Sequence, residues 1–167
     1  MRIYRLSQFS VIDGMGGMRA AGRWHTIGRR VFYAAEHPAL ALVEVLAHFR
    51  VSLDRMPINF RMVAIEVAAG AIISPEPDLP HNWSSNEATS QAVGDAWLDS
   101  NAGLLLPVPS AIVNARNYVV NAAHPQAPSH LRVVSDEPFW FDPRLARSKA
   151  AGEHPGAGAN SPPNAAL

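Results

Sequence analysis

The segment from Val31 to Phe49 limits the possible folds more than any other part of the chain. It begins with β-branched and aromatic residues, Val31-Phe32-Tyr33-Ala34, which are typical of a short buried strand. His37-Pro38 follows, and because proline loses no hydrogen bond in the first turn of a helix, the sequence predicts a helix from this point. Apolar side chains cover most of that helix, at positions 40, 42, 43, 45, 46 and 49. We therefore expect a strand followed by a helix that is packed on most of its sides.

Glu44 is the single acidic residue of this apolar helix. Moving a carboxylate out of water costs several kcal/mol unless another group compensates for the lost hydration. Helical spacing places Glu44 on a narrow stripe with His37, Ala41 and His48, which suits the wall of a cleft. Two interpretations remain open from these residues: a structural ion pair with an arginine or with His48, or a carboxylate that belongs to a functional site.

The approach to the strand is rich in glycine. Gly14-Met15-Gly16-Gly17 and Ala20-Ala21-Gly22 precede Arg23, and we expect a mobile loop in which a ligand can come close to the backbone. A guanidinium donates two parallel hydrogen bonds to a phosphate, so Arg23 is a candidate for holding a pyrophosphate. The glycines match neither the Walker motif nor the dinucleotide-binding fingerprint. Taken alone, Arg23 is more simply interpreted as a structural or surface arginine.

Several motifs occur in a characteristic order. Gly22-Arg23-Trp24 is followed by Tyr33, ten residues after the arginine, and by Glu44, eleven residues after the tyrosine. The helix around Glu44 reads Ala-Leu-Ala-Leu-Val-Glu-Val-Leu-Ala-His. The later blocks are Gly94-Asp95-Ala96-Trp97-Leu98, Leu106-Pro107-Val108-Pro109-Ser110-Ala111-Ile112-Val113, Asn117-Tyr118-Val119-Val120-Asn121 with His124-Pro125, and Phe141-Asp142-Pro143-Arg144-Leu145. Together they resemble the RES domain, the toxin half of RES–Xre toxin–antitoxin pairs, over residues 1–145.

The resemblance implies a single α+β domain with a core similar to that of ADP-ribosyltransferase toxins, built from short, mainly antiparallel sheets with flanking helices. It also implies an enzyme that cleaves the nicotinamide–ribose bond of NAD+, with water, phosphate or a protein side chain as the acceptor. The functional arginine, tyrosine, glutamate and serine of the family fall on Arg23, Tyr33, Glu44 and Ser110. An Xre-type antitoxin that blocks the active site is the implied partner.

This sequence departs from the family pattern at two places. His25 stands where asparagine is common, and Ala34-Ala35 replaces the threonine and serine that often follow the tyrosine. The second departure removes hydroxyl groups that could contact the nicotinamide ribose. It therefore bears on how the substrate is held more than on whether it is cleaved.

The implied chemistry agrees with the types of residue. Loss of nicotinamide from NAD+ leaves an oxocarbenium-like ribose, which a carboxylate stabilises as in glycoside hydrolases, and Glu44 is assigned this role. Tyr33 would stack its ring on nicotinamide or ribose and present its hydroxyl, and Arg23 would bind the diphosphate. Ser110 would donate to phosphate or ribose, or is an ordinary serine at the start of a strand. Transfer of ADP-ribose to a protein and a catalytically inactive binding module are the alternative functions.

Composition excludes other classes of protein. The 167 residues suit one domain, and the absence of cysteine excludes disulfides and thiolate catalysis. Seven histidines show no paired metal-ligand spacing, so we expect no metal. The resemblance implies that NAD+ is a substrate and that there is no cofactor. Fourteen basic and fourteen acidic residues argue against direct binding of nucleic acid, which is left to a partner. The start of the chain lacks the apolar core of a signal peptide and no apolar run is long enough to span a bilayer, so a cytoplasmic location is expected.

Further elements follow from local patterns. We expect strands at residues 3–6, 60–67, 104–106, 111–113, 118–120, 131–134 and 139–141, and a helix at about 86–99 that Gly94 weakens by about 1 kcal/mol relative to alanine. After Leu145, small and polar residues dominate. Residues 146–167 are therefore predicted to form a disordered, low-complexity tail outside the domain of residues 1–145.

Overall fold

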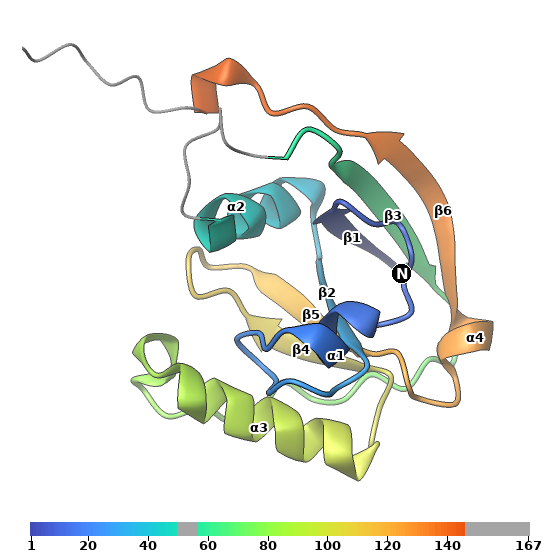
Figure 1. The fold of residues 1–167 in the computed structure, drawn as a ribbon. Helices are drawn as coiled ribbons and strands as arrows, with labels where there is room; N and C mark the ends of the chain where they lie inside the picture. The colour runs from blue at the N-terminus through green and yellow to red at the C-terminus, as the bar shows by residue number, and fades with distance from the viewer. Residues whose placement is uncertain (50–56, 146–167) are drawn as a thin grey trace, which may run out of the picture.

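The computed structural model describes residues 1–49 and 57–145, and over this part the chain forms an antiparallel sheet with flanking helices (Figure 1). Its strands are β1 (Arg2–Ser7), β2 (Val31–Ala35), β3 (Arg61–Val67), β4 (Leu105–Pro109), β5 (Arg116–Asn121) and β6 (Leu131–Pro138). Its helices are α1 (Met15–Arg19), α2 (Pro38–Phe49), α3 (Glu87–Ser100) and α4 (Ala127–His130). The strand order is β4-β5-β2-β1-β3-β6, and each neighbouring pair is antiparallel. The α+β class expected from the sequence is confirmed.

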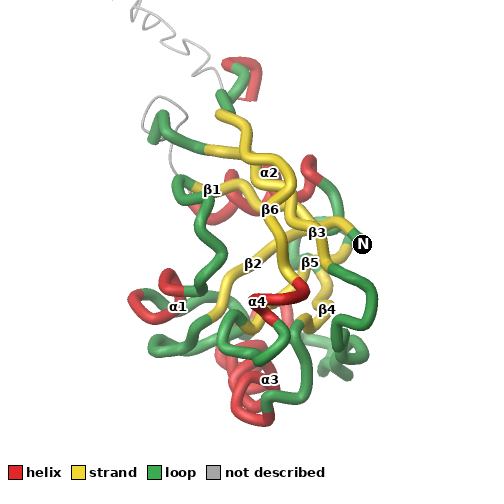
Figure 2. Tube along the Cα trace, turned by 90° about the vertical axis from the view of Figure 1, so that its right-hand side faces the viewer, coloured by secondary structure: helices red, strands yellow, loops and turns green. Residues whose placement is uncertain are grey.

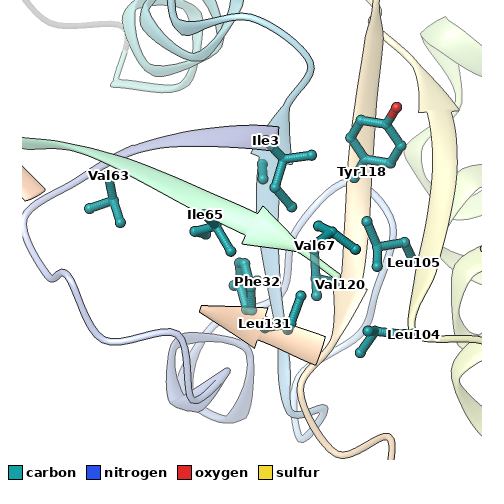
Figure 3. Packing of buried hydrophobic residues seen from close by; sticks show 11 residues of the cluster. Ile3, Phe32, Val63, Ile65, Val67, Leu104, Leu105, Tyr118, Val120 and Leu131 are labelled. Atoms are coloured by element: carbon teal, nitrogen blue, oxygen red, sulfur yellow. The ribbon is translucent and has the colours of Figure 1, made fainter. Parts of the chain in front are cut away.

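One face of the sheet carries the largest apolar cluster. Because side chains alternate along a strand, Phe32 and Ala34 of β2 point to this face together with Tyr118 and Val120 of β5. Figure 3 shows residues of strands β1 to β6 converging there, together with Leu104, which directly precedes β4. The cluster comprises Ile3, Phe32, Ala34, Val63, Ile65, Val67, Leu104, Leu105, Tyr118, Val120 and Leu131. The curled sheet thus buries this face largely against its own strands.

The opposite face carries two separate apolar clusters. Helix α2 contributes Leu40 and Ala41 to one of them, above β1 and the end of β2. Trp97 of α3 belongs to the other, which lies over β4, β5 and the start of β2. Figures 1 and 2 both show α2 and α3 well apart, with β2, β4 and β5 between them. The strand residues between the two helices therefore form the floor of the candidate site.

Helix α2 begins at Pro38, as the sequence predicts, but it is less enclosed than expected. Leu40 and Ala41 are buried, whereas Leu42 to Leu46 are half-buried and His48 is exposed. One side of the helix packs on β1 and β2, and the small Ala41 lies at that contact instead of facing out. The stripe that holds Glu44 thus runs along the border of the packed surface.

Two of the expected strands are wrong. Residues 111–113 form a turn, because the Ser110 hydroxyl accepts hydrogen bonds from the backbone N–H groups of Ile112 and Val113 and reverses the chain toward β5. Strand β6 ends at Pro138, so residues 139–141 are not a strand, and only the Phe139 N–H continues toward Phe60. The other expected strands and the helix near residues 86–99 are confirmed within a few residues. The short helices α1 and α4 were not expected.

The predicted tail, residues 146–167, lies outside the described residues, so the domain boundary after residue 145 stays a prediction. No helix in the described part of the chain is long and apolar enough to cross a membrane.

Candidate functional site

Arg23 lies in a tight loop before β2. The backbone closes this loop between Gly22 and His25, where the Gly22 N–H donates to the His25 carbonyl at 3.0 Å. A side chain at position 22 would meet the Tyr33 hydroxyl at 2.7 Å and the His25 ring at 2.8 Å. Glycine is therefore needed here for packing within the protein, and the same holds for Gly17 against the Arg29 carbonyl at 2.4 Å. The expected access for a ligand at these two glycines is taken by the protein itself.

The Tyr33 hydroxyl joins this loop to the sheet. It accepts a hydrogen bond from the Trp24 N–H at 3.1 Å and lies 2.6 Å from Nδ1 of His25. Nε2 of His25 lies 3.1 Å from the Ala20 carbonyl, which can only accept, so Nε2 carries the proton and Tyr33 donates to Nδ1. Burial raises the pKa of the Tyr33 hydroxyl and lowers the pKa of His25. Both groups are neutral, and the Tyr33 hydroxyl donates its proton to His25 within the loop.

Helix α3 fastens the same loop from the other side. The Gln91 side chain donates to the Gly22 carbonyl at 3.0 Å, and one turn later Asp95 accepts from the Thr26 N–H at 3.0 Å and from its hydroxyl at 2.6 Å. Trp24 is buried against Trp83, with ring centroids 5.4 Å apart. These contacts fix the backbone on both sides of Arg23.

The Arg23 side chain itself is only lightly engaged. Its Nη1 donates to the Ser84 carbonyl at 3.1 Å, and the side chain is half-buried. No ion pair within the described residues includes this guanidinium. A guanidinium has five N–H donors, so most of them are left for an anionic ligand.

Glu44 projects from α2 toward the sheet and meets Asn117 of β5. The Asn117 amide donates to Oε1 of Glu44 at 2.5 Å. The ion pairs found among residues 1–49 and 57–145 do not include Glu44, so the structural pair with an arginine or His48 is not observed there. Every buried side-chain oxygen in this part of the chain has a partner, and within the described residues Oε2 of the half-buried Glu44 accepts no hydrogen bond. Among these residues, Oε2 therefore stays available as an acceptor.

Ser110 lies at the turn that joins β4 to β5. Its hydroxyl oxygen accepts from the N–H groups of Ile112 and Val113 at 3.1 and 3.3 Å, and the residue is buried. The structural role considered from the sequence is thus present, although as a turn and not as the start of a strand. The hydroxyl proton has no acceptor within the described residues, so it can still be donated to a ligand.

The structure brings three of the four residues predicted from the sequence to one face of the sheet. Tyr33 is paired with Val119, and Asn117 lies two residues along β5 on the same face, where the diagonal spacing is about 7–8 Å. Arg23 joins them through the loop fixed to Tyr33, and Glu44 joins them through Asn117. Ser110 stands at the β4–β5 turn beside this floor.

Sequence reasoning missed two residues of this arrangement. Asn117 was assigned no role, yet asparagine is disfavoured inside strands, and its place in an apolar, aromatic run was a usable signal. His25 was noted only as a departure from asparagine, and nothing local reveals that it bonds to Tyr33 and Ala20. Among residues 1–49 and 57–145, no three histidine or acidic side chains come together in a way that could hold a metal ion.

The fold and site define an α+β protein with arginine, tyrosine and glutamate side chains gathered beside one face of an antiparallel sheet. The family model described as the RES domain matches residues 2–142. A Pseudomonas putida protein named Toxin Res is 39% identical over 146 residues, which cover 87% of this chain and 99% of that protein. A Sphingobium protein named Prs ADP-ribosylating toxin is 33% identical over 143 residues, covering 81% and 87% of the two chains.

Among solved structures, that of the Mycobacterium tuberculosis MbcT–MbcA toxin–antitoxin complex is similar, with a TM-score of 0.68 and 20% identity. The match covers 86% of this chain and 85% of that one. Because the identity is low, this match supports the fold alone. The chain belongs to the RES domain family.

Proposed function

We propose that this protein is the toxin of a toxin–antitoxin pair and that it degrades NAD+ by cleaving the nicotinamide–ribose bond. One observation carries the proposal most directly: the Glu44 carboxylate has one oxygen held by a neutral amide, and within the described residues its other oxygen has no hydrogen-bond partner, beside the face that carries Tyr33. This is the state required of a carboxylate that stabilises a developing cation. The names of the relatives, Toxin Res and an ADP-ribosylating toxin, support the same class of enzyme.

The proposed reaction needs little proton transfer. The bond between ribose C1′ and the pyridinium nitrogen breaks, and its electron pair leaves with nicotinamide, which becomes neutral. The ribose is left as an oxocarbenium ion, and Glu44 stabilises its charge until an acceptor oxygen adds to C1′. When water is the acceptor the products are nicotinamide, ADP-ribose and a proton, and when phosphate adds the products are nicotinamide and ADP-ribose with the phosphate on that same carbon.

The other site residues hold the substrate in this proposal. Arg23 binds the diphosphate with the N–H groups that Ser84 leaves free. Tyr33 positions the arginine loop through its hydroxyl and offers its ring to the nicotinamide end, because the hydroxyl proton is already donated to His25. Ser110 donates its remaining proton to a phosphate or a ribose hydroxyl.

A protein partner completes the proposal. The similar solved structure is a complex of a toxin with its antitoxin, and the sequence motifs resemble the toxin half of RES–Xre pairs. We propose an Xre-type antitoxin that covers the site and blocks Arg23, and that carries any contact with DNA. The balanced charge of this chain, with 14 basic and 14 acidic residues, agrees with that division of roles.

The decisive experiment is to incubate the purified protein with NAD+, with and without phosphate, and to identify the products by mass spectrometry. Wild type is expected to release nicotinamide, while Glu44→Gln and Arg23→Ala each lose about a hundredfold or more, as is usual when a group that stabilises transition-state charge is removed. Both variants should keep their fold, and Glu44→Gln can gain stability since an amide is cheaper to bury than a carboxylate. Equal release by wild type and Glu44→Gln would contradict the mechanism.

A second candidate is transfer of ADP-ribose to a protein, which uses the same residues and is favoured by the name of the Sphingobium relative. Adding cell lysate and labelled NAD+ distinguishes the two. A labelled protein band that disappears with Glu44→Gln supports transfer, and free ADP-ribose or its phosphate supports degradation. A protein that binds NAD+ without consuming it would be an inactive module of the same fold.

A further inference from the structure

We propose that Asn117 is a positioning residue, whose side-chain amide fixes the carboxylate of Glu44 in the orientation that the reaction requires. This inference rests on the proposed function, since it assigns to Asn117 a role in the cleavage of NAD+. Its basis is the hydrogen bond of 2.5 Å between Nδ2 of Asn117 and Oε1 of Glu44, which links two residues 73 positions apart.

The backbone under Asn117 is fixed on both sides. Strand β5 lies between β2 and β4, and Asn117 is paired with Ala35 on one neighbour and with Val108 on the other. Glu44 instead lies on a helix whose residues 42–46 are only half-buried, and its side chain has several rotatable bonds. The rigid partner in the contact is therefore the asparagine, and the carboxylate is the group that it orients.

The chemistry of the contact also favours this role. A carboxylate can only accept hydrogen bonds, so the amide nitrogen is the donor. A neutral donor orients the carboxylate without cancelling its charge, whereas an arginine in the same place would weaken its attraction for a cationic sugar. The guanidinium of Arg116, the neighbour of Asn117, is paired with Glu76 at 3.4 Å, while the backbone N–H of Arg116 donates to Glu36 at 2.7 Å. This nearby cation is thus directed to Glu76.

The contact leaves the rest of the carboxylate available. Within the described residues Oε2 of Glu44 accepts no hydrogen bond, and Asn117 lies diagonally across the strands from Tyr33 on the same face. A residue chosen only for packing in this strand would be β-branched or aromatic, like the residues that follow it. The amide is thus explained by what it does to Glu44.

The test compares Asn117→Ala with Asn117→Asp in nicotinamide release. Asn117→Ala is expected to lower kcat by about 10- to 100-fold while KM for NAD+ changes less than about threefold, because a hydrogen bond to a charged group is lost but the substrate contacts remain. Asn117→Asp keeps the shape but places a second carboxylate against Glu44, so its kcat should fall further. A role in packing alone predicts the reverse order.

A double-mutant cycle tests whether Asn117 acts on the reaction through Glu44. In the Glu44→Gln background, Asn117→Ala should change kcat less than about twofold, since the group that it orients is gone. Asn121→Ala is the matched control, because Asn121 lies on the same strand and face but bonds to Asn101 at 2.9 Å; it should lower the stability and leave kcat near that of wild type.

The outcomes separate the two proposals. If wild type consumes NAD+ and Asn117→Ala retains its kcat, or loses activity equally with and without Glu44, the positioning role is overturned and the proposed function stands. If folded wild type releases no nicotinamide, the proposed function is wrong, and the positioning role of Asn117, which depends on it, is wrong as well. The thermal unfolding of each variant shows whether a loss of activity comes from loss of the fold.

Discussion

At the scale of single residues, the contact between His25 and Tyr33 gives the site a dependence on pH. Burial lowers the pKa of His25 below its ordinary value of 6.5, with Asp95 and the Ala20 carbonyl opposing this effect and Arg29 adding to it. Protonation would place a hydrogen on Nδ1, toward the hydroxyl that now donates to it, and Tyr33 would have to turn its own proton elsewhere. The neutral imidazole is therefore part of the folded loop.

We predict that His25 makes the protein less stable in acid. From about one pH unit above 6.5 the ring is largely neutral in both the folded and the unfolded chain, and it adds little slope. As the pH falls below 6.5, His25 becomes protonated in the unfolded chain but stays neutral in the folded chain. The free energy of unfolding therefore falls until the lower pKa of His25 in the folded chain is reached. One proton gives at most about 1.4 kcal/mol per pH unit.

The measurement is urea unfolding of wild type and His25→Asn between about pH 5 and pH 8. The variant removes the titrating ring, so its stability should fall less steeply in acid, whatever its stability at neutral pH. His81→Gln is the control, because it removes an exposed histidine that takes no part in the contact between His25 and Tyr33. An identical slope in wild type and His25→Asn would show that this histidine is protonated normally in the folded state.

The residues of the site differ in how far the sequence can reveal them. Arg23, Tyr33 and Glu44 could be proposed because their order and spacing resemble a family and their chemistry suits one reaction. Asn117 and His25 act through contacts that depend on three-dimensional placement, and Asn117 reaches Glu44 across 73 positions of the chain. Hydrogen-bond partners of that kind are set by strand order, which local patterns do not contain.

At the scale of elements, the side chains of helix α3 hold the loop that carries Arg23. Gln91, Asp95 and Asp99 recur every fourth residue, so they lie on one side of the helix, where they bond to Gly22, Thr26 and Arg29. Gly94 lies at the close approach of this helix to the loop, where an added side-chain carbon would be 1.8 Å from the Trp24 carbonyl oxygen. The helix is thus a support for the loop that carries Arg23.

We predict that Gly94→Ala destabilises the protein. Helix propensity alone predicts a gain of about 1 kcal/mol, which is the expectation from the sequence. The clash involves backbone atoms that cannot rotate away, and forced overpacking typically costs about 1–3 kcal/mol. We expect a net loss of stability in urea unfolding, together with a raised KM for NAD+ because the arginine loop is displaced.

Gly16→Ala is the matched control for this substitution. Gly16 is also helical, in α1, and a side-chain carbon there would meet no atom within 4 Å. Its stability should equal or slightly exceed that of wild type. If Gly94→Ala is as stable as Gly16→Ala, then the helix can move away from the loop and the close approach is not required.

The elements themselves were largely predictable, and the errors have physical causes. Proline at the start of α2 and the β-branched runs of β2 and β3 are local signals, and they gave correct positions. The apolar run at residues 111–113 has the composition of a strand, but a single serine hydroxyl captures its N–H groups and makes it a turn. Composition alone does not reveal when a side chain takes the backbone N–H groups that would otherwise bond to a neighbouring strand.

At the scale of the whole molecule, the sheet order explains how distant segments reach one site. Strand β2, which carries Tyr33, lies next to β5, although β2 begins at Val31 and β5 begins 85 residues later at Arg116. The register pairs Tyr33 with Val119. The order β4-β5-β2-β1-β3-β6 is not implied by any local pattern, because antiparallel strands of similar composition can pair in many ways. This is the part of the fold that required the structure.

The last prediction concerns how much of the chain the activity needs. The family model ends at residue 142, the last described helical turn ends at Leu145, and the alignment with the Pseudomonas putida protein covers 99% of that protein but 87% of this chain. A chain of residues 1–145 therefore contains every residue that the proposed reaction uses. We expect it to release nicotinamide at a rate within about twofold of full length and to unfold at the same temperature, since every contact described above for the site lies between residues of this shorter chain. A truncation to residue 135 is the opposing control: it cuts β6, which pairs with β3 along its whole length, and should unfold. Loss of activity in the 1–145 chain with its melting temperature unchanged would place a substrate contact in residues 146–167 and extend the functional unit beyond the family domain.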